Sequence, residues 1–448
     1  MKLRLFIYLL IFAGILSQGQ LNAQQTRSLS LQEAITMSLN ASGQIKAGQA
    51  KIEEALAALN EANERKLPDA AFSGSHIRLN NPNIDLKSKS TSSSGSGNTT
   101  SEPPGKVSSA TYGIFNVSLP IYAGSKIKYG IEAARYLAEA TRLDAANDKD
   151  AVILNTINAY DNLYKSKAAV DLVKENVGSA SERVKQFTNL EKNGLLARND
   201  LLKAELQVSN SELSLLDAEN NWKLANIAMD LMLDLPESTE LNPEAESLLS
   251  KNDLKTIEDY EQLALQNRKD KAALELRKKA AGTEVKVIKG DMYPSIGLTG
   301  GYIAASVPNL LTVYNAVNIG VGVKYSLSSL WKNKSKVEQA KARETQIAAN
   351  EGILNDNIRY QVNQTYQAYL LSQKKIEVYR KAIAQAEENY KIVKNKYDNA
   401  LANTTDLLDA DVAQLQAKLN YAFSKSDASV AYYKLLQTAG LLQSEITK

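Results

Sequence analysis

The chain has 448 residues, and its 53 Lys and Arg nearly balance its 50 Asp and Glu, which favours neither a nucleic-acid partner nor an acidic ligand. It contains no cysteine and a single histidine, so Cys/His zinc sites, thiol redox chemistry and Cys or His nucleophiles are excluded or nearly so. It also lacks a nucleotide-binding loop and a Ser/His/Asp set. We therefore expect no cofactor, no metal site and no enzymatic activity.

Residues 1–23 are typical of a secretory signal peptide. Lys2 and Arg4 precede an apolar run that ends at Leu16, and Ala23 provides the small residue expected before a cleavage site. No later segment reaches the ~18 continuous apolar residues that a transmembrane helix needs. The sequence therefore predicts an exported protein, which could cross a membrane only with β-strands.

The first half of the mature chain changes from helix to strands and back to helix. Residues 24–66 are predicted as an N-terminal helix, with a capping box at Ser30 and Glu33 and a stop before Pro68. Residues 67–120 are predicted as two strands joined by a flexible Ser/Gly-rich loop at 80–109. Residues 121–232 are predicted as a long helical hairpin.

The second half repeats this order after an inter-repeat linker at 233–252. Residues 253–290 are predicted as a helix, 291–328 as two more strands, and 329–448 as a second long hairpin with a C-terminal segment. Apolar residues alternate with small or polar ones in the strands, as at Ile296, Leu298 and Tyr302. This pattern predicts a sheet with one apolar face.

The two hairpins share a short polar break, which we interpret as a hairpin tip built twice. Residues 194–205 and 400–411 align at an offset of 206, with a common Asp-Leu-Leu-x-Ala motif. In the helices before and after these breaks, core-facing residues follow one another at spacings of four and three, which predicts coiled-coil seams. One runs through Ile153, Ile157, Tyr160 and Tyr164, and another through Leu202, Leu206, Ser209, Leu213 and Leu216.

These elements predict an oligomeric membrane pore with a long helical extension. An arm of about 65 residues would reach roughly 100 Å at 1.5 Å per residue, more than a globular domain needs. Four strands cannot close a barrel alone, because single-chain barrels begin near eight strands, but several copies could.

The sequence resembles the TolC-type outer-membrane channel family over almost the whole mature chain. The residues that carry this resemblance are the two repeats, the junction at 118–124 (Ser-Leu-Pro-Ile-Tyr-Ala-Gly) and the two tip motifs, which comprise Gly194, Leu201, Leu202, Ala204, Leu407, Leu408 and Ala410. The fold class implied is mainly α with a small β part, in a protomer built from two repeats. Three protomers would form a homotrimer with a shared twelve-stranded barrel in the outer membrane of a Gram-negative bacterium. Their helices would form a tunnel in the periplasm.

The resemblance also implies partners and a function. A periplasmic adaptor protein would dock at the tips and link the channel to an inner-membrane pump of the RND or ABC type, while outer-membrane lipid would surround the barrel. The channel would act as the passive exit duct of a tripartite efflux pump, with type I protein secretion as the alternative. A structural periplasmic coiled-coil protein is a further alternative, which the alternating strands disfavour.

By the same resemblance, Asp406 and Asp409 are candidate pore-entrance acids, and Tyr397, Asn199 and Asp200 are candidate gate residues that link neighbouring helices. The two entrance acids are spaced i, i+3, so both can lie on one side of a helix. The simpler interpretation of Asp406 and Asp200 is that each stabilises the start of its helix.

One family feature is absent, because the arginine expected four residues before the motif aspartate is replaced by Ala402. Arg198 is the candidate substitute.

Tyr122 and Trp331 occupy nearly equivalent positions where strands lead into helices. They are candidates for an aromatic belt at the membrane interface, with ordinary corner packing as the alternative. The sequence leaves open the exported substrate, the particular pump and adaptor, and the role of the 80–109 loop.

Overall fold

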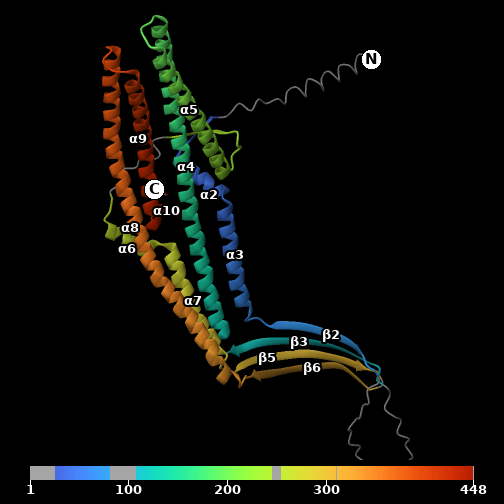
Figure 1. Ribbon diagram of the computed structural model, residues 1–448. Helices are drawn as coiled ribbons and strands as arrows, with labels where there is room; N and C mark the ends of the chain where they lie inside the picture. Colours follow the sequence, from blue (N-terminus) through green and yellow to red (C-terminus); the bar gives the residue numbers. More distant parts are fainter. Residues whose placement is uncertain (1–25, 81–106, 245–253, 309, 447–448) are drawn as a thin grey trace, which may run out of the picture. The chain divides into compact units, whose positions relative to one another are not determined.

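The computed structural model describes residues 26–80, 107–244, 254–308 and 310–446 (Figure 1). The predicted signal peptide, most of the predicted 80–109 loop and part of the predicted 233–252 linker lie outside these residues. The chain divides into two compact units. We call them the helical unit (residues 1–50, 143–272 and 352–448) and the strand unit (residues 51–142 and 273–351). None of the helices in the described ranges combines the length and apolar character needed to span a membrane.

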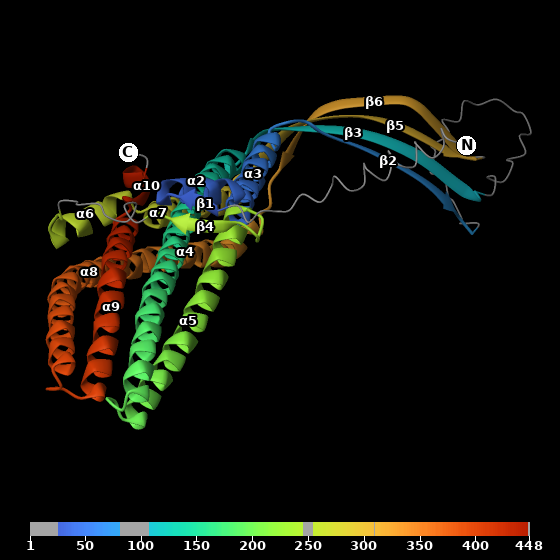
Figure 2. The same cartoon turned by 90° about the horizontal axis from the view of Figure 1, so that it is seen from above.

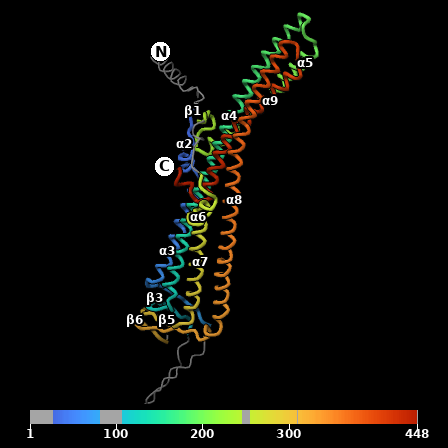
Figure 3. Tube along the Cα trace, turned by 90° about the vertical axis from the view of Figure 1, so that its left-hand side faces the viewer, coloured from blue at the N-terminus to red at the C-terminus, as the bar shows by residue number. Residues whose placement is uncertain are grey.

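Four long helices run into two hairpins. The first hairpin joins α4 (Lys126–Lys192) to α5 (Arg198–Leu233), and the second joins α8 (Ser329–Asp398) to α9 (Thr404–Thr438). In the helical unit the two hairpins lie side by side, and their tips are at the same end (Figures 2 and 3). Both tips therefore belong to one unit and can be compared directly.

The core of the helical unit lies away from the tips and confirms the first predicted seam. Ile153, Ile157 and Tyr160 of α4 are buried together with Met229 of α5 and Leu435 of α9. The Tyr160 hydroxyl donates a 2.8 Å hydrogen bond to the Leu29 carbonyl and accepts one of 2.8 Å from the Glu244 amide. Both polar functions of this buried phenol are thus satisfied.

The second predicted seam is wrong for a single chain. Leu202, Leu206, Leu213 and Leu216 are exposed. The buried face of α5 is displaced by one or two residues. It begins with Leu201 at the tip and continues with small side chains: Ala204, Ser211, Ala218 and Ala225. Small residues allow helices to approach closely, so they occupy the contact within the chain and leave the leucines on its outside.

Short elements that the sequence did not predict surround this core. β1 (Thr26–Leu29) pairs in parallel with β4 (Glu240–Pro243) as a two-stranded sheet. The predicted helices at 24–66 and 253–290 are each interrupted. They form α2 (Leu31–Ala41) and α3 (Gly43–Glu64), and α6 (Ile257–Asn267) and α7 (Lys269–Gly290). The breaks fall at Ser42 and Arg268, whose backbones leave the helical region, and α10 (Leu442–Ile446) closes the chain.

The strand unit contains one antiparallel sheet of four strands (Figure 1). Its order is β2 (Asp69–Arg78), β3 (Ser109–Ala123), β5 (Ser295–Val307) and β6 (Leu311–Lys324). Each repeat supplies two strands, and β3 pairs with β5 where the repeats meet. In the described chain neither edge strand, β2 nor β6, has a further partner.

The register of the strands places the predicted apolar residues on one face. Phe115 pairs with Tyr302, which pairs with Val317. Leu119 pairs in the same way with Leu298, and Leu298 pairs with Val321. The rows between them are polar or small: Asn116, Gly301 and Asn318, then Ser118, Thr299 and Gly320. Since side chains alternate along a strand, the sheet has one apolar and one polar face.

Candidate functional site at the hairpin tips

Both hairpin tips turn with the same backbone geometry. Gly194 and Ala400, which align in the repeat, are both left-handed, with φ of 70° and 57°. The next amides, of Leu195 and Leu401, donate to the carbonyls of Leu190 and Lys396 at 2.8 and 2.7 Å. These bonds satisfy the last carbonyls of α4 and α8 in the manner of a Schellman motif. The repeated sequence therefore builds one turn twice.

The helices that leave the two tips begin differently. α9 begins with a capping box, in which the Asn403 side chain accepts from the Asp406 amide at 2.9 Å and the Asp406 side chain accepts from the Asn403 amide at 3.4 Å. α5 begins after Ala197, which has no side chain to cap it. Asp200 lies in the first turn of α5, with its carboxylate 3.6 Å from the Lys203 ammonium. Only the second tip is capped by side chains.

A small apolar cluster joins the two tips. Phe187, Leu201, Ala204 and Leu407 are buried together. The Tyr397 ring stacks on Phe187 with 5.5 Å between centroids. Among the other tip-motif residues, Leu408 and Ala410 are buried, whereas Gly194 and Leu202 are exposed. The motif thus contributes one well-buried leucine from each copy to a shared contact.

The candidate gate residues are only partly brought together. Burial raises the pKa of the Tyr397 phenol, a hydrogen bond with Thr404 opposes this rise, and the nearby charge of Asp200 adds to it. Tyr397 and Asp200 are therefore close enough to interact electrostatically. Asn199 is exposed. Arg198 reaches Glu191 of its own hairpin, at 3.8 Å, rather than the second tip.

The candidate entrance acids lie at the start of α9. Asp406 and Asp409 are both exposed, although Asp406 also takes part in the capping box. In the described part of the chain no cation lies within ion-pair distance of Asp409. Asp409 therefore retains an uncompensated charge at the protein surface.

A polar network below the tips, whose central ion pair is buried, escaped prediction. Arg183 of α4 donates to the Asp411 carboxylate of α9 at 3.0 Å and to the Tyr390 hydroxyl of α8 at 3.0 Å. Asn176 of α4 donates to the same Asp411 oxygen at 3.3 Å and accepts from Ser211 of α5 at 3.1 Å. This network, which we call the tip clamp, takes side chains from all four long helices. The sequence places Asn176 and Arg183 seven residues apart, on one face of a helix, but this spacing does not identify Asp411 as their partner.

The tip clamp is held together by charge in a buried place. Burial disfavours the charged Arg183 guanidinium, but the hydrogen bond and charge of Asp411 outweigh it and raise the pKa of Arg183 above its ordinary value. The two side chains retain only 8% and 5% of their accessible surface. Arg183 and Asp411 therefore form a buried, oppositely charged pair.

The candidate interface aromatics are both exposed in the strand unit. Tyr122 lies near the end of β3, and Trp331 lies in the first turn of α8. Both remain candidates for the membrane interface.

The chain repeats a unit of strands and long helical hairpins, and its sheet is apolar on one face, as expected of an outer-membrane channel protomer. The family model described as outer membrane efflux protein matches residues 34–233 and 261–441. The chain therefore belongs to the outer membrane efflux protein family and is an outer-membrane protein. The predicted TolC-type membership is confirmed.

Individual relatives agree with this assignment. The outer membrane efflux protein BepC of Brucella suis biovar 1 (strain 1330) is 23% identical over 425 residues, covering 92% of this chain and 91% of that protein. Two solved structures share the fold. The outer membrane protein VceC of Vibrio cholerae has a TM-score of 0.73 and 18% identity, over 92% of this chain and 96% of that one. The CmeC outer membrane channel of Campylobacter jejuni has a TM-score of 0.74 and 19% identity, over 92% of this chain and 86% of that one.

Proposed function

We propose that three copies of the chain form the passive exit duct of a tripartite efflux pump. The observation that carries this proposal is the sheet of the strand unit. Its edge strands β2 and β6 lack partners in the described chain, and unpaired strand edges must be covered or closed inside a membrane. Three copies of four strands supply twelve, which is enough to close a barrel.

The two faces of the sheet suit the two sides of such a barrel. The apolar rows, with Ile319 exposed at 87%, would face lipid. The polar and small rows would face an aqueous lumen, where small side chains leave the passage wide. The exposed Tyr122 and Trp331 would then lie at the membrane interface.

The tips are the proposed docking site of a periplasmic adaptor that connects the duct to an inner-membrane pump of the RND or ABC type. Leu195 and Leu401 occupy equivalent positions at the two tips and are 74% and 77% exposed. Exposed leucines at equivalent sites, repeated around three copies, offer an apolar ring to a partner. The pump would supply the energy, since the chain itself has no nucleotide-binding motif.

Asp406 and Asp409 are the proposed acids of the pore entrance. Both are exposed on the first turns of α9, and three copies would bring six carboxylates to one opening. Rings of carboxylates attract cations and repel anions at a constriction. The entrance would therefore prefer cations.

Reconstitution in planar bilayers tests the proposal. We expect the purified protein to migrate as a trimer and to form cation-preferring pores. The double variant Asp406→Asn, Asp409→Asn should lose much of that preference, whereas Glu219→Gln, an exposed acid on α5, should keep it. A monomer without conductance would contradict the duct, and unchanged selectivity in the double variant would contradict the assignment of the acids alone.

A further inference from the structure

A cluster of lysines lies at the start of α8, in the strand unit, with little negative charge beside it. Lys332, Lys334 and Lys336 belong to the first turns of this helix, and all three are exposed. In the part of the chain that the structure describes, Lys332 and Lys336 have no acid within ion-pair distance. Lys334 reaches only Glu338, at 4.0 Å. The junction between β6 and α8 therefore carries a local excess of positive charge.

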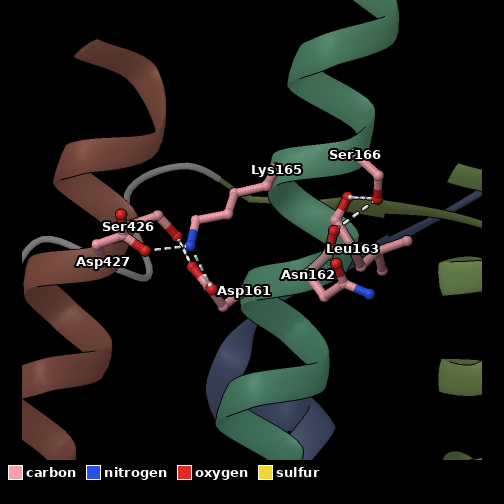
Figure 4. A network of polar contacts seen from close by, with 7 residues as sticks. All are labelled: Asp161, Asn162, Leu163, Lys165, Ser166, Ser426 and Asp427. Carbon is pink, nitrogen blue, oxygen red and sulfur yellow. Dashed lines mark hydrogen bonds and ion pairs between the residues drawn. The ribbon is translucent and has the colours of Figure 1, made fainter. Parts of the chain in front are cut away.

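Lys165 of the helical unit shows how a lysine with a structural role is held in this protein (Figure 4). Its side chain extends from α4 toward α9 and lies between Asp161, at 2.8 Å, and Asp427. Ser426 donates to the other oxygen of Asp161. Burial disfavours the charged ammonium, but the hydrogen bonds and charges of the two aspartates outweigh it and raise the pKa of Lys165. The lysines of α8 lack such a setting.

The position of the α8 lysines is also unfavourable for the helix itself. Lys332 and Lys336 are spaced i, i+4, so two like charges lie on one side of the helix and repel each other. The N-terminal end of a helix is its positive end and favours acids, yet α8 has none in its first turn. The helices α2, α5, α6, α7 and α9 do carry an acid there. Helix stability therefore does not explain these lysines.

The equivalent junction of the first repeat is better compensated. α4 also begins without an acid in its first turn, and it begins with Lys126. However, the Lys126 ammonium pairs with the Asp291 carboxylate at 2.9 Å. Lys128 lies over the Tyr129 ring, 5.8 Å from its centroid. The uncompensated charge is thus concentrated at the second junction, where the two repeats differ.

The lysines adjoin exposed apolar surface at the same end of the sheet. Trp331 precedes Lys332 directly and is 66% exposed. Tyr122 pairs with Ile296, which pairs with Val323, and this row continues the apolar face of the sheet to its helical end. Ammonium groups at the border of an apolar surface complement a phospholipid, which has apolar chains and a negative phosphate.

The length of the strands places this border at a suitable depth in the proposed barrel. β5 has 13 residues and β6 has 14. Such strands are roughly 45 Å long at about 3.3 Å per residue. At a tilt of about 45° they span about 30 Å, which is the thickness of the hydrocarbon core. Residues that directly follow β6 therefore lie at the level of the lipid headgroups.

We propose that Lys332, Lys334 and Lys336, together with Trp331, form a binding surface for anionic phospholipid in the periplasmic leaflet of the membrane. We call this surface the lipid collar. Its ammonium groups bind lipid phosphates, and the Trp331 ring lies beside the adjoining part of the acyl chains. Each lysine near an anionic membrane surface contributes roughly a fivefold preference. The inference rests on the proposed duct function, because the closed barrel is what brings the junction to a membrane surface.

Quenching of Trp331 fluorescence by spin-labelled lipids tests the lipid collar. The chain has two tryptophans, so Trp222→Phe leaves Trp331 as the single reporter in the full-length trimer. The trimer is reconstituted in phosphatidylcholine vesicles with a small fraction of spin-labelled lipid. Spin-labelled phosphatidylglycerol should quench Trp331 severalfold more strongly than spin-labelled phosphatidylcholine. The difference should shrink as salt is added, because the attraction is between exposed charges.

Two triple variants separate the collar from general electrostatics. Lys332→Gln, Lys334→Gln, Lys336→Gln should bring the two quenching values together. Its matched control is Lys375→Gln, Lys381→Gln, Lys391→Gln, which removes the same charge from exposed positions of α8 in the helical unit. The control should keep the difference between the two lipids.

Equal quenching by the two lipids in the parent protein, or an unchanged difference in the first triple variant, would overturn the lipid collar. A difference that millimolar inorganic phosphate removes would also overturn it, since that result indicates an isolated phosphate site rather than a membrane surface. If the triple variant does not assemble, Lys332→Gln and Lys336→Gln decide the question singly, and an unchanged difference in both would overturn the collar.

Conductance of the same preparation in planar bilayers separates this proposal from the duct. Pores without a preference for the anionic lipid would contradict the collar alone. Absence of pores would contradict the duct itself.

Discussion

The two hairpin tips are built from the same backbone but present different chemistry. Gly194 and Ala400 adopt the same left-handed turn, and Leu201 and Leu407 are buried in one cluster. In the first tip the aspartate lies beside one cation, because the Lys203 ammonium is 3.6 Å from the Asp200 carboxylate. The second uses its aspartate in a capping box and exposes another, Asp409, three residues later.

The difference shows which features of a repeat are structural. Features that both copies keep, the left-handed turn and the buried leucine, serve folding of the hairpin. Features that differ, such as Asp409 where the first copy has Lys203, are available for function. Asp409 is therefore a stronger candidate for a functional role than Asp406, whose side chain already has a structural role in the capping box.

The largest effect on stability is expected at the buried leucine that both tips share. Leu201→Ala and Leu407→Ala should each cost about 2–5 kcal/mol of stability, because each leaves a cavity in the tip cluster. Thermal unfolding followed by circular dichroism measures this. Leu195→Ala and Leu401→Ala, at exposed equivalent positions, serve as controls and should leave the midpoint nearly unchanged. A clear inequality between the two buried leucines would show that the tips are not equivalent in packing.

A smaller effect is expected where the caps differ. Asn403→Ala should destabilise the start of α9 by about 1 kcal/mol, because the amide of Asp406 loses its acceptor. Ala197→Asn should stabilise α5 by a similar amount, since the extended backbone of Ala197 suits a capping residue. The same unfolding experiment compares both variants. If both variants left the unfolding midpoint unchanged, the capping box would not distinguish the two tips.

At the left-handed turn position, exchanging alanine and glycine should change stability in opposite directions at the two tips. Ala400→Gly should stabilise the second tip by up to ~1 kcal/mol, because glycine adopts the left-handed conformation without a Cβ clash. Gly194→Ala should cost the first tip a comparable amount. Proteolytic nicking at the tips under native conditions is a sensitive local readout, and it should fall in the first variant and rise in the second.

The smallest effect is expected from the surface charges of the first tip. Arg198→Ala removes a 3.8 Å contact with Glu191 and should change stability by less than about 0.5 kcal/mol, since exposed ion pairs contribute little. Unfolding at low and high salt checks this, and a large salt-dependent loss would instead show Arg198 to be a structural element of the tip.

Much of the fold was predictable because its signals are local. Proline and the period-2 alternation located the four strands, and the offset of 206 located both tips. The short strands β1 and β4 were not predictable, because four residues are too few for a periodic pattern and their pairing spans more than 200 residues. The breaks at Ser42 and Arg268 were missed because neither residue is a strong helix breaker.

The candidate site was predicted less completely than the fold. The acids and Tyr397 followed from the tip motif, but the tip clamp did not. Arg183 and Asp411 are 228 residues apart, and nothing near either residue shows that the two meet. Their burial depends on how one hairpin lies against the other, which is a property of tertiary packing.

The sequence alone therefore determined the repeat and the family, which follow from comparing whole segments of the chain. It also determined the position of the tips and the faces of the strands, which depend on residues within a few turns of one another. Tertiary structure decided which face of α5 is buried, where Arg198 points and which charges are compensated. The physical reason is that an amphipathic pattern indicates only that a helix has a contact face. Which helix packs against that face, and which charge pairs with a charge placed in it, is decided only when the hairpins pack together.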